Sequence, residues 1–138
     1  MSGILHAMEV HTINPWTWQD QFGFVQANAV TAGERTVYCS GQTSMDADGN
    51  PLHEGDLRAQ LGQALDNLEA VLRASGCGLS DVVRLNYYTT DLDGFFAAMD
   101  VASARLQDAG CRPASTLLEV SGLALPPLLV EVEATAVT

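Results

Sequence analysis

Residues 112–137 read RPASTLLEVSGLALPPLLVEVEATAV, and this stretch says more about the fold than any other part of the chain. After its Pro-Pro pair the chain alternates between apolar and polar residues. The apolar set is Val130, Val132, Ala134 and Ala136, and the polar set is Glu131, Glu133 and Thr135. A period of two is typical of a half-buried strand. Carboxylates on its polar face are solvated by default, although one that faces a cleft can act as a base that activates water.

The rest of the chain predicts two helices and further strands, while residues 1–13 give little signal. The predicted strands cover residues 24–30, 36–40, 82–89, 116–120 and 129–137, with a hairpin turn at 32–35. The first helix runs from the cap Asp56 to about Ser75, and its apolar stripe is Leu57, Leu61, Leu65, Leu68 and Leu72. The second runs from the cap Asp93 to Gly110, and its expected inward residues are Phe95, Phe96, Met99, Ala102 and Leu106. The order ββαβαββ predicts an α+β fold with the helices on one face of the sheet.

Composition limits the function more than the fold. The chain has 138 residues, of which 47% are hydrophobic and 17% charged, so a single domain over residues 1–138 with a packed core is expected. The net charge is −11, and the 6 basic residues are all arginine. The lack of lysine excludes Schiff-base chemistry on a lysine. The acidic balance also argues against nucleic acid as a partner, because phosphate contacts need clustered cations.

The sequence predicts neither a metal site nor a membrane partner. No CxxC pair occurs among the cysteines, which are Cys39, Cys77 and Cys111, and we expect these to be reduced thiols. Metal-ligand spacing is also missing from the histidines, which are His6, His11 and His53. No signal peptide or long apolar run is found, which favours a cytoplasmic protein.

Four segments, taken in order, resemble the RidA family, also called YjgF/YER057c/UK114, the reactive-intermediate deaminases. They are VYCSGQ at 37–42, QALDNL at 63–68, DVVR at 81–84 with TDL at 90–92, and PAST at 113–116 with the closing EVEATA at 131–136. The resemblance implies a chorismate-mutase-like subunit with a mixed sheet and two helices on one face. It also implies a homotrimer with clefts between subunits, and cofactor-free deamination of a small-molecule imine.

The resemblance suggests roles for several residues. Glu131 aligns with the family's glutamate, which orients a water for attack on a C=N carbon. Phe24 takes the place of a cleft tyrosine and keeps the ring without the hydroxyl. Backbone groups at Ser40 and Gly41 would contact the ligand, or equally these residues form a simple tight turn, and Leu117 takes the place of a cysteine. With Trp16 and Trp18 nearby, Phe24 indicates either an apolar pocket or contacts of the core or between subunits.

One position departs from the family pattern, because Ser115 stands where active members carry an arginine directly after Pro-Ala. That arginine would hold a substrate carboxylate by two parallel hydrogen bonds, and its loss should cost about 2–5 kcal/mol of binding. Either the ligand is not a 2-imino acid, or Arg112 or Arg84 supplies the missing cation. On the strand over residues 82–89, Asn86 could bind a ligand or equally satisfy backbone groups of the sheet.

Two functional hypotheses follow. The first is a hydrolase of small imines or enamines, with Glu131 as the residue that orients water and a substrate less anionic than 2-iminopropanoate. The second is a non-catalytic binding module of the same trimeric fold, which the change from arginine to serine favours. The sequence gives little support to a third hypothesis, a general chaperone-like activity, since it contains no large apolar stripe beyond the two helix faces. The ribonuclease activity described for some family members conflicts with the charge.

Overall fold

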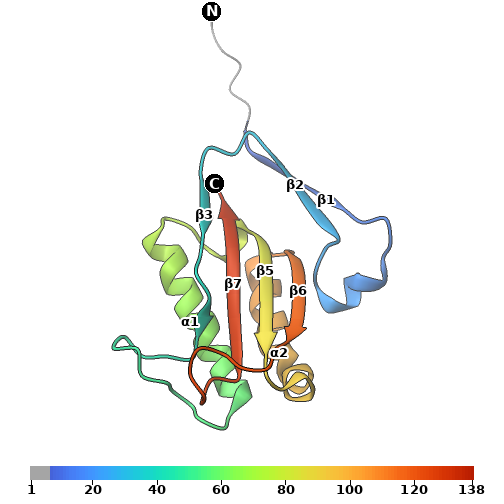
Figure 1. The fold of residues 1–138 in the computed structure, drawn as a ribbon. Helices are drawn as coiled ribbons and strands as arrows, with labels where there is room; N and C mark the ends of the chain where they lie inside the picture. Colours follow the sequence, from blue (N-terminus) through green and yellow to red (C-terminus); the bar gives the residue numbers. More distant parts are fainter. Residues whose placement is uncertain (1–6) are drawn as a thin grey trace, which may run out of the picture.

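A mixed sheet carries both long helices on one face (Figure 1), and the computed structural model describes this for residues 7–138. The sheet order is β3-β7-β5-β6, and β4 also pairs with β7. The strands are β3 (Thr36–Tyr38), β4 (Gln42–Thr43), β5 (Val82–Thr89), β6 (Ala114–Glu119) and β7 (Val130–Val137). The helices are α1 (Leu57–Ala74) and α2 (Leu92–Ala109), and a short 3-10 turn, Leu79–Asp81, precedes β5. The predicted α+β class is confirmed.

Chain connections explain the mixed character of the sheet. Strands β5 and β6 are parallel, and α2 forms the crossover between them, as a parallel pair requires. Strand β7 then runs antiparallel to β5 on one side and to β3 and β4 on the other. The last strand in chain order is therefore the centre of the sheet, and Glu131 lies on it.

Apolar periodicity decides which faces are buried. The predicted alternation in β7 is confirmed, because Val130, Val132, Ala134 and Ala136 are all buried under the helices. The predicted stripe on α1 is equally confirmed, and each of its leucines is buried. Asp56 caps α1 by accepting a hydrogen bond from the Ala59 N–H at 3.0 Å, as expected. The polar residues of β7 are left on the face that no helix covers.

Two predictions for α2 were wrong. Its cap is Asp91 and not Asp93, because the Asp91 carboxylate reaches the Gly94 N–H at 2.9 Å. Asp93 lies inside the first turn, where a negative charge favours the helix dipole. Phe96 does not face inward and is 52% exposed, whereas Phe95 is 2% exposed. Successive residues point about 100° apart around a helix axis, so Phe95 can face the core while Phe96 turns partly to solvent.

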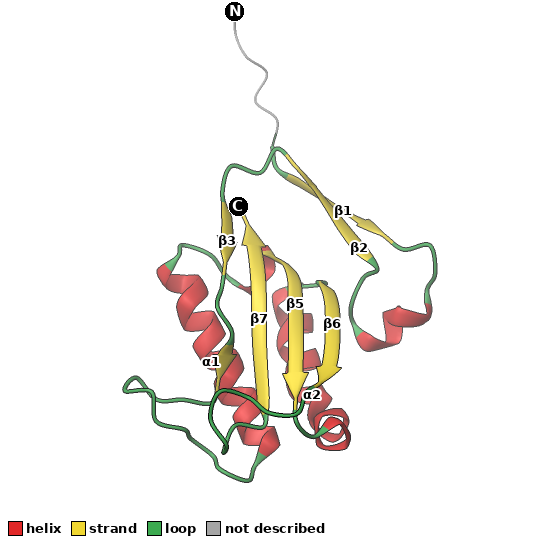
Figure 2. Ribbon diagram, in the orientation of Figure 1, coloured by secondary structure: helices red, strands yellow, loops and turns green. Residues whose placement is uncertain are grey.

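The predicted hairpin between residues 24–30 and 36–40 was also wrong. Strand β2 (Ala27–Thr31) pairs with β1 (Glu9–Ile13) in a separate two-stranded sheet, which projects beside the main one (Figure 2). The backbone N–H groups of Glu34 and Arg35 instead bond the Thr138 carbonyl, which draws the next strand onto β7. Every residue of β1 is exposed, so no apolar alternation marks it in the sequence. The order of strands and helices is thus ββββαβαββ.

Within residues 7–138, no helix is long and apolar enough to cross a membrane.

Candidate functional site

Residues expected to form one site lie on opposite faces of the sheet. Glu131 is on the face left open by the helices, and Gly41 packs directly against it. Ser115 and Leu117 pair in register with Leu85 and Tyr87 of β5, whose side chains point toward the helix layer. Because the sheet separates them, Glu131 and Ser115 of the same chain do not share a cavity.

Glu131 is a half-buried carboxylate held against backbone. It lies opposite Tyr88 of β5 and Thr43 of β4. A Cβ atom built on Gly41 would come within 2.5 Å of Glu131 Oε1, so only glycine lets this loop approach so closely. Burial raises the pKa of Glu131, and the charge of Glu133 raises it further. No hydrogen bond within residues 7–138 stabilises its ionised form, which leaves the carboxylate free to accept a proton from water.

Glu133, two residues further along the same face, has the opposite environment. Tyr88 Oη donates a hydrogen bond to its Oε1 atom, and Asn86 Nδ2 donates another at 3.1 Å. These two bonds lower the pKa of Glu133, and Arg84 contributes in the same direction. Two neighbouring carboxylates whose pKa values are moved apart can take different roles. Glu133 stays ionised, while Glu131 can exchange a proton nearer neutral pH.

Asn86 and Ser40 both have partners within the chain. The Asn86 carbonyl oxygen accepts a hydrogen bond from the Thr116 N–H at 3.1 Å, so both ends of this amide are engaged. Ser40 is exposed beside Gly41, and its carbonyl accepts a bond from the Gln42 side chain at 3.2 Å. The role of these residues in ligand binding stays a prediction.

A second group of predicted residues lines an apolar cleft on the helix face. Phe24, Ser115 and Leu117 all border this cleft, whose volume is about 280 Å³. Ser115 Oγ donates a hydrogen bond to the Leu85 carbonyl, which holds the hydroxyl against the sheet. Trp18 packs edge-on against Phe24 with ring centroids 5.8 Å apart.

Sequence reasoning missed much of this lining. Tyr87 of β5 and several α2 residues, namely Phe95, Phe96, Met99, Ala102 and Leu106, also border the cleft. The alternation of β5 places Tyr87 on the face of Leu85, and this signal was available in the sequence. The sequence carried no signal that α2 would stand away from β6 and leave a hollow between them.

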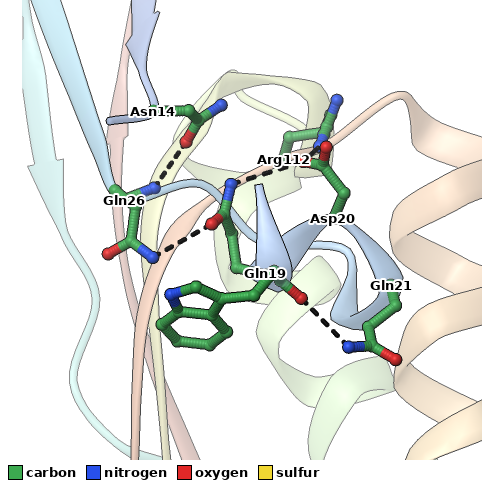
Figure 3. Close-up of polar contacts among 7 residues, drawn as sticks. Asn14, Gln19, Asp20, Gln21, Gln26 and Arg112 are labelled. Atoms are coloured by element: carbon green, nitrogen blue, oxygen red, sulfur yellow. Dashed lines mark hydrogen bonds and ion pairs between the residues drawn. The ribbon is translucent and has the colours of Figure 1, made fainter. Parts of the chain in front are cut away.

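Neither candidate arginine lines the cleft. Arg112 forms an ion pair with Asp20 at 2.9 Å (Figure 3). Arg84 donates a hydrogen bond to Thr116 Oγ1 at 2.9 Å on the open face. On β5, Arg84 is four residues from Tyr88, the cross-strand partner of Glu131, and this corresponds to roughly 13 Å along a strand. Arg84 therefore shares a face with Glu131, and Arg112 does not.

A chain of polar contacts fixes the aromatic segment beside the cleft (Figure 3). The 3-10 helix η1 (Trp18–Phe22) contains Gln19, which is completely buried. Gln19 accepts a hydrogen bond from the Gln26 side chain at 3.0 Å and donates one to Asp20 at 3.3 Å. Asp20 then binds Arg112, which lies just before β6. The segment that carries Phe22 and Phe24 is thus tied to the strand that forms the opposite wall.

The thiols of Cys39, Cys77 and Cys111 are free, as expected, and all three are buried. Burial raises the pKa of Cys111 to about 12, so this thiol stays protonated. The part of the chain that the structure describes contains no cluster of three or more potential metal ligands. His6 lies outside the described residues.

Comparison with protein-family models gives a match over residues 21–138 to the family described as Endoribonuclease L-PSP. Among curated relatives, the 2-iminobutanoate/2-iminopropanoate deaminase of Rattus norvegicus is 34% identical over 105 residues. This match covers 75% of the present chain and 74% of the rat protein.

Solved structures support the same relationship. A Yersinia pestis protein of the conserved Rid family, YyfB, whose function is described as unknown, superposes with a TM-score of 0.82. The two are 34% identical, and the match covers 95% of this chain and 98% of that one. The E. coli protein TdcF with bound serine superposes with a TM-score of 0.67 at 25% identity, over 83% of this chain and 87% of TdcF.

Proposed function

The chain belongs to the RidA/YjgF/YER057c/UK114 family, and from this premise we propose that it hydrolyses small imines or enamines without a cofactor. The observation that carries the proposal is the environment of Glu131. Its carboxylate is half-buried and packs against Gly41. Burial raises its pKa, and no group among residues 7–138 donates a hydrogen bond to it. A base that titrates closer to the working pH is better suited to take a proton from water.

The reaction would proceed in two balanced steps. The water oxygen bonds to the C=N carbon while Glu131 takes one water proton, the π electrons move to nitrogen, and Glu131 then passes that proton to the nitrogen to give a neutral carbinolamine. In the second step Glu131 takes the hydroxyl proton as the oxygen forms the C=O bond, the C–N electron pair leaves with the nitrogen, and Glu131 delivers the proton to it, which releases ammonia. Imine and water thus give a carbonyl compound and ammonia, and Glu131 returns to its starting state.

A complete site of this kind requires more than one subunit. Glu131 lies on the open face, while Phe24, Ser115 and Leu117 border the cleft on the other face. We therefore propose a homotrimer in which the open face of one subunit brings Glu131 to the cleft of another. Sedimentation should give about three times the 14.7 kDa mass of one chain, and a mass near 14.7 kDa would contradict this site.

The substrate would carry less negative charge than a 2-imino acid. Ser115 occupies the position at which the resemblance places the carboxylate-binding arginine, and its hydroxyl is held by the Leu85 carbonyl. Arg112 borders a neighbouring hollow that shares Phe22, Gly23, Ser103 and Leu106 with the cleft, and it would have to leave its ion pair with Asp20 to replace that arginine. Arg84 is the better placed of the two, because it shares the open face with Glu131.

The same observations favour a second candidate, a non-catalytic module that binds a small metabolite. In that case the cleft holds a ligand, and Glu131 contributes polarity and no turnover. The loss of the family's arginine is the specific observation behind this alternative.

Ammonia release from freshly generated imines distinguishes the hydrolase from the non-catalytic binding module. The wild type and the variants Glu131→Gln and Ser115→Arg would be assayed with 2-iminopropanoate and with an uncharged ketimine. Turnover of the uncharged substrate that disappears in Glu131→Gln would support the hydrolase. Activity on 2-iminopropanoate only in Ser115→Arg would show a competent scaffold with a different natural substrate. Failure of all proteins on all substrates would refute the hydrolase and leave the binding module.

A further inference from the structure

We propose that the cleft on the helix face binds the apolar part of an uncharged ligand, and that Tyr87 Oη donates a hydrogen bond to a carbonyl or imine acceptor of that ligand. The nature of the reacting group rests on the proposed function, whereas the binding itself does not. Tyr87 is then a residue that determines specificity, on the strand that forms the floor of the cleft.

The size and lining of the cleft suit an apolar ring. Its volume is about 280 Å³, and a cavity of about 150 Å³ lined by aliphatic and aromatic side chains is large enough to bind benzene. Phe24, Phe95, Met99, Leu106 and Leu117 are among its walls. Within residues 7–138, no charged side chain borders it. A single substituted ring would therefore find apolar contact on several sides.

Tyr87 contributes the unused donor of this cleft. Its side chain is 8% exposed and packs on Phe95 with ring centroids 5.2 Å apart. Its hydroxyl has no hydrogen-bond partner in the described part of the chain. Among residues 7–138, Asn28 Oδ1 is the sole fully buried polar side-chain atom that lacks a hydrogen-bond partner. Since the Tyr87 hydroxyl also lacks a partner, it is not fully buried and keeps some contact with open space. Burial raises the pKa of Tyr87, so the hydroxyl stays protonated and can act as a donor.

The other hydroxyls on the cleft wall are already used as donors. Ser115 donates to the Leu85 carbonyl, and Ser103 donates to the Met99 carbonyl at 3.1 Å. A carboxylate in this cleft would meet one side-chain donor, and the nearest hollow's cation, Arg112, is already paired with Asp20, so its lost hydration would not be replaced. A neutral ketone or ketimine needs only one donor. The pattern of donors thus selects an uncharged acceptor attached to an apolar group.

Acetophenone is a suitable probe, because it combines a ring with one carbonyl acceptor. Two matched compounds isolate the two features: ethylbenzene lacks the carbonyl, and benzoylformate carries a carboxylate in place of the methyl group. Isothermal titration calorimetry with wild type should show acetophenone binding about tenfold more tightly than either, as expected for one buried hydrogen bond or one unpaired charge.

Two variants and a control test the residues involved. Tyr87→Phe keeps the ring against Phe95, so it should fold and lose about tenfold in acetophenone affinity while binding ethylbenzene unchanged. Ser103→Phe, at an exposed position on the wall, should fill the cleft and remove binding of both. Tyr38→Phe removes a hydroxyl that is 80% exposed on β3, and it should bind like wild type.

The outcomes separate this inference from the proposed function. Acetophenone binding that is equal in wild type and Tyr87→Phe would overturn the role of Tyr87, and binding that survives Ser103→Phe would overturn the cleft. Tighter binding of benzoylformate than of acetophenone, or no binding of acetophenone at all, would overturn the ligand class even if imines are turned over. Binding as expected, in a protein without turnover, would support the inference and refute the hydrolase.

Discussion

Replacing Gly41 by alanine should impair catalysis far more than folding. The new Cβ atom would lie 2.5 Å from Glu131 Oε1 and 2.7 Å from its Cδ atom, whereas ordinary contact begins at 3.4 Å. The carboxylate must therefore move by about 0.9 Å, the difference between 3.4 Å and 2.5 Å. A misplacement of about 1 Å can reduce a rate by about 100-fold. Since Glu131 is only half-buried, its side chain can shift toward solvent, and the free energy of unfolding should fall by no more than about 1 kcal/mol.

Ammonia release measured with the best imine substrate gives kcat/KM for the variant, and urea unfolding gives its stability. Gly122→Ala is the matched control, because a Cβ atom at Gly122 meets nothing within 4 Å, and this protein should keep wild-type activity. If the single variant Glu131→Gln is inactive but Gly41→Ala keeps the wild-type rate, the idea that this glycine fixes the position of the base is refuted.

Three further predictions concern titration and packing. The raised pKa of Glu131 means that the folded state binds its proton more tightly than the unfolded chain, so the group opposes folding once pH rises through the folded value. Glu131→Gln should accordingly be more stable than wild type at neutral pH and lose this advantage in acid, as urea unfolding at several pH values would show. The lowered pKa of Glu133 has the opposite effect, because its ionised form stabilises the folded state. Tyr88→Phe removes a hydrogen bond to that carboxylate, so it should lower the free energy of unfolding by up to about 1 kcal/mol at neutral pH, and this loss should vanish as pH falls through the folded pKa of Glu133. A loss that does not change with pH would contradict this. Gln60 is completely buried and bonds the Pro127 carbonyl and the Leu129 N–H, so Gln60→Leu should destabilise by about 1–3 kcal/mol in thermal or urea unfolding, and a neutral result would mean that water replaces both bonds.

Elements with a strong period could be predicted from the sequence, because their burial leaves a pattern in it. The alternation at 130–136 and the leucines of α1 correctly indicated a strand and a helix, each with one buried face. The strand β1 could not be predicted in this way, since both faces of residues 9–13 are exposed. The capping of α2 was ambiguous for a local reason: Asp91 and Asp93 are both competent caps, and the backbone conformation decides between them.

The candidate site could be predicted only in parts. Glu131 and Gly41 come together because β4 pairs with β7, and this long-range register is not encoded by either segment alone. The separation of Glu131 from Ser115 follows from their opposite phases on β7 and β6, which an alignment of motifs does not reveal. Tyr87 escaped notice because a tyrosine on a buried strand is ordinarily a core residue, and its unpaired hydroxyl depends on the hollow beside α2.

The central place of β7 has a consequence for how the chain reaches its native state during synthesis. Among residues 7–138, β3 and β4 have β7 as their partner in the sheet, although almost the whole domain separates them in the chain. The βαβ unit of β5, α2 and β6 can form from neighbouring segments, but β3 and β4 must wait, unpaired, until β7 leaves the ribosome. Such distant pairing slows folding and exposes strand edges in the interval. The nascent chain should therefore depend on chaperones until residues 130–137 have left the ribosome, and a truncation before β7 should aggregate.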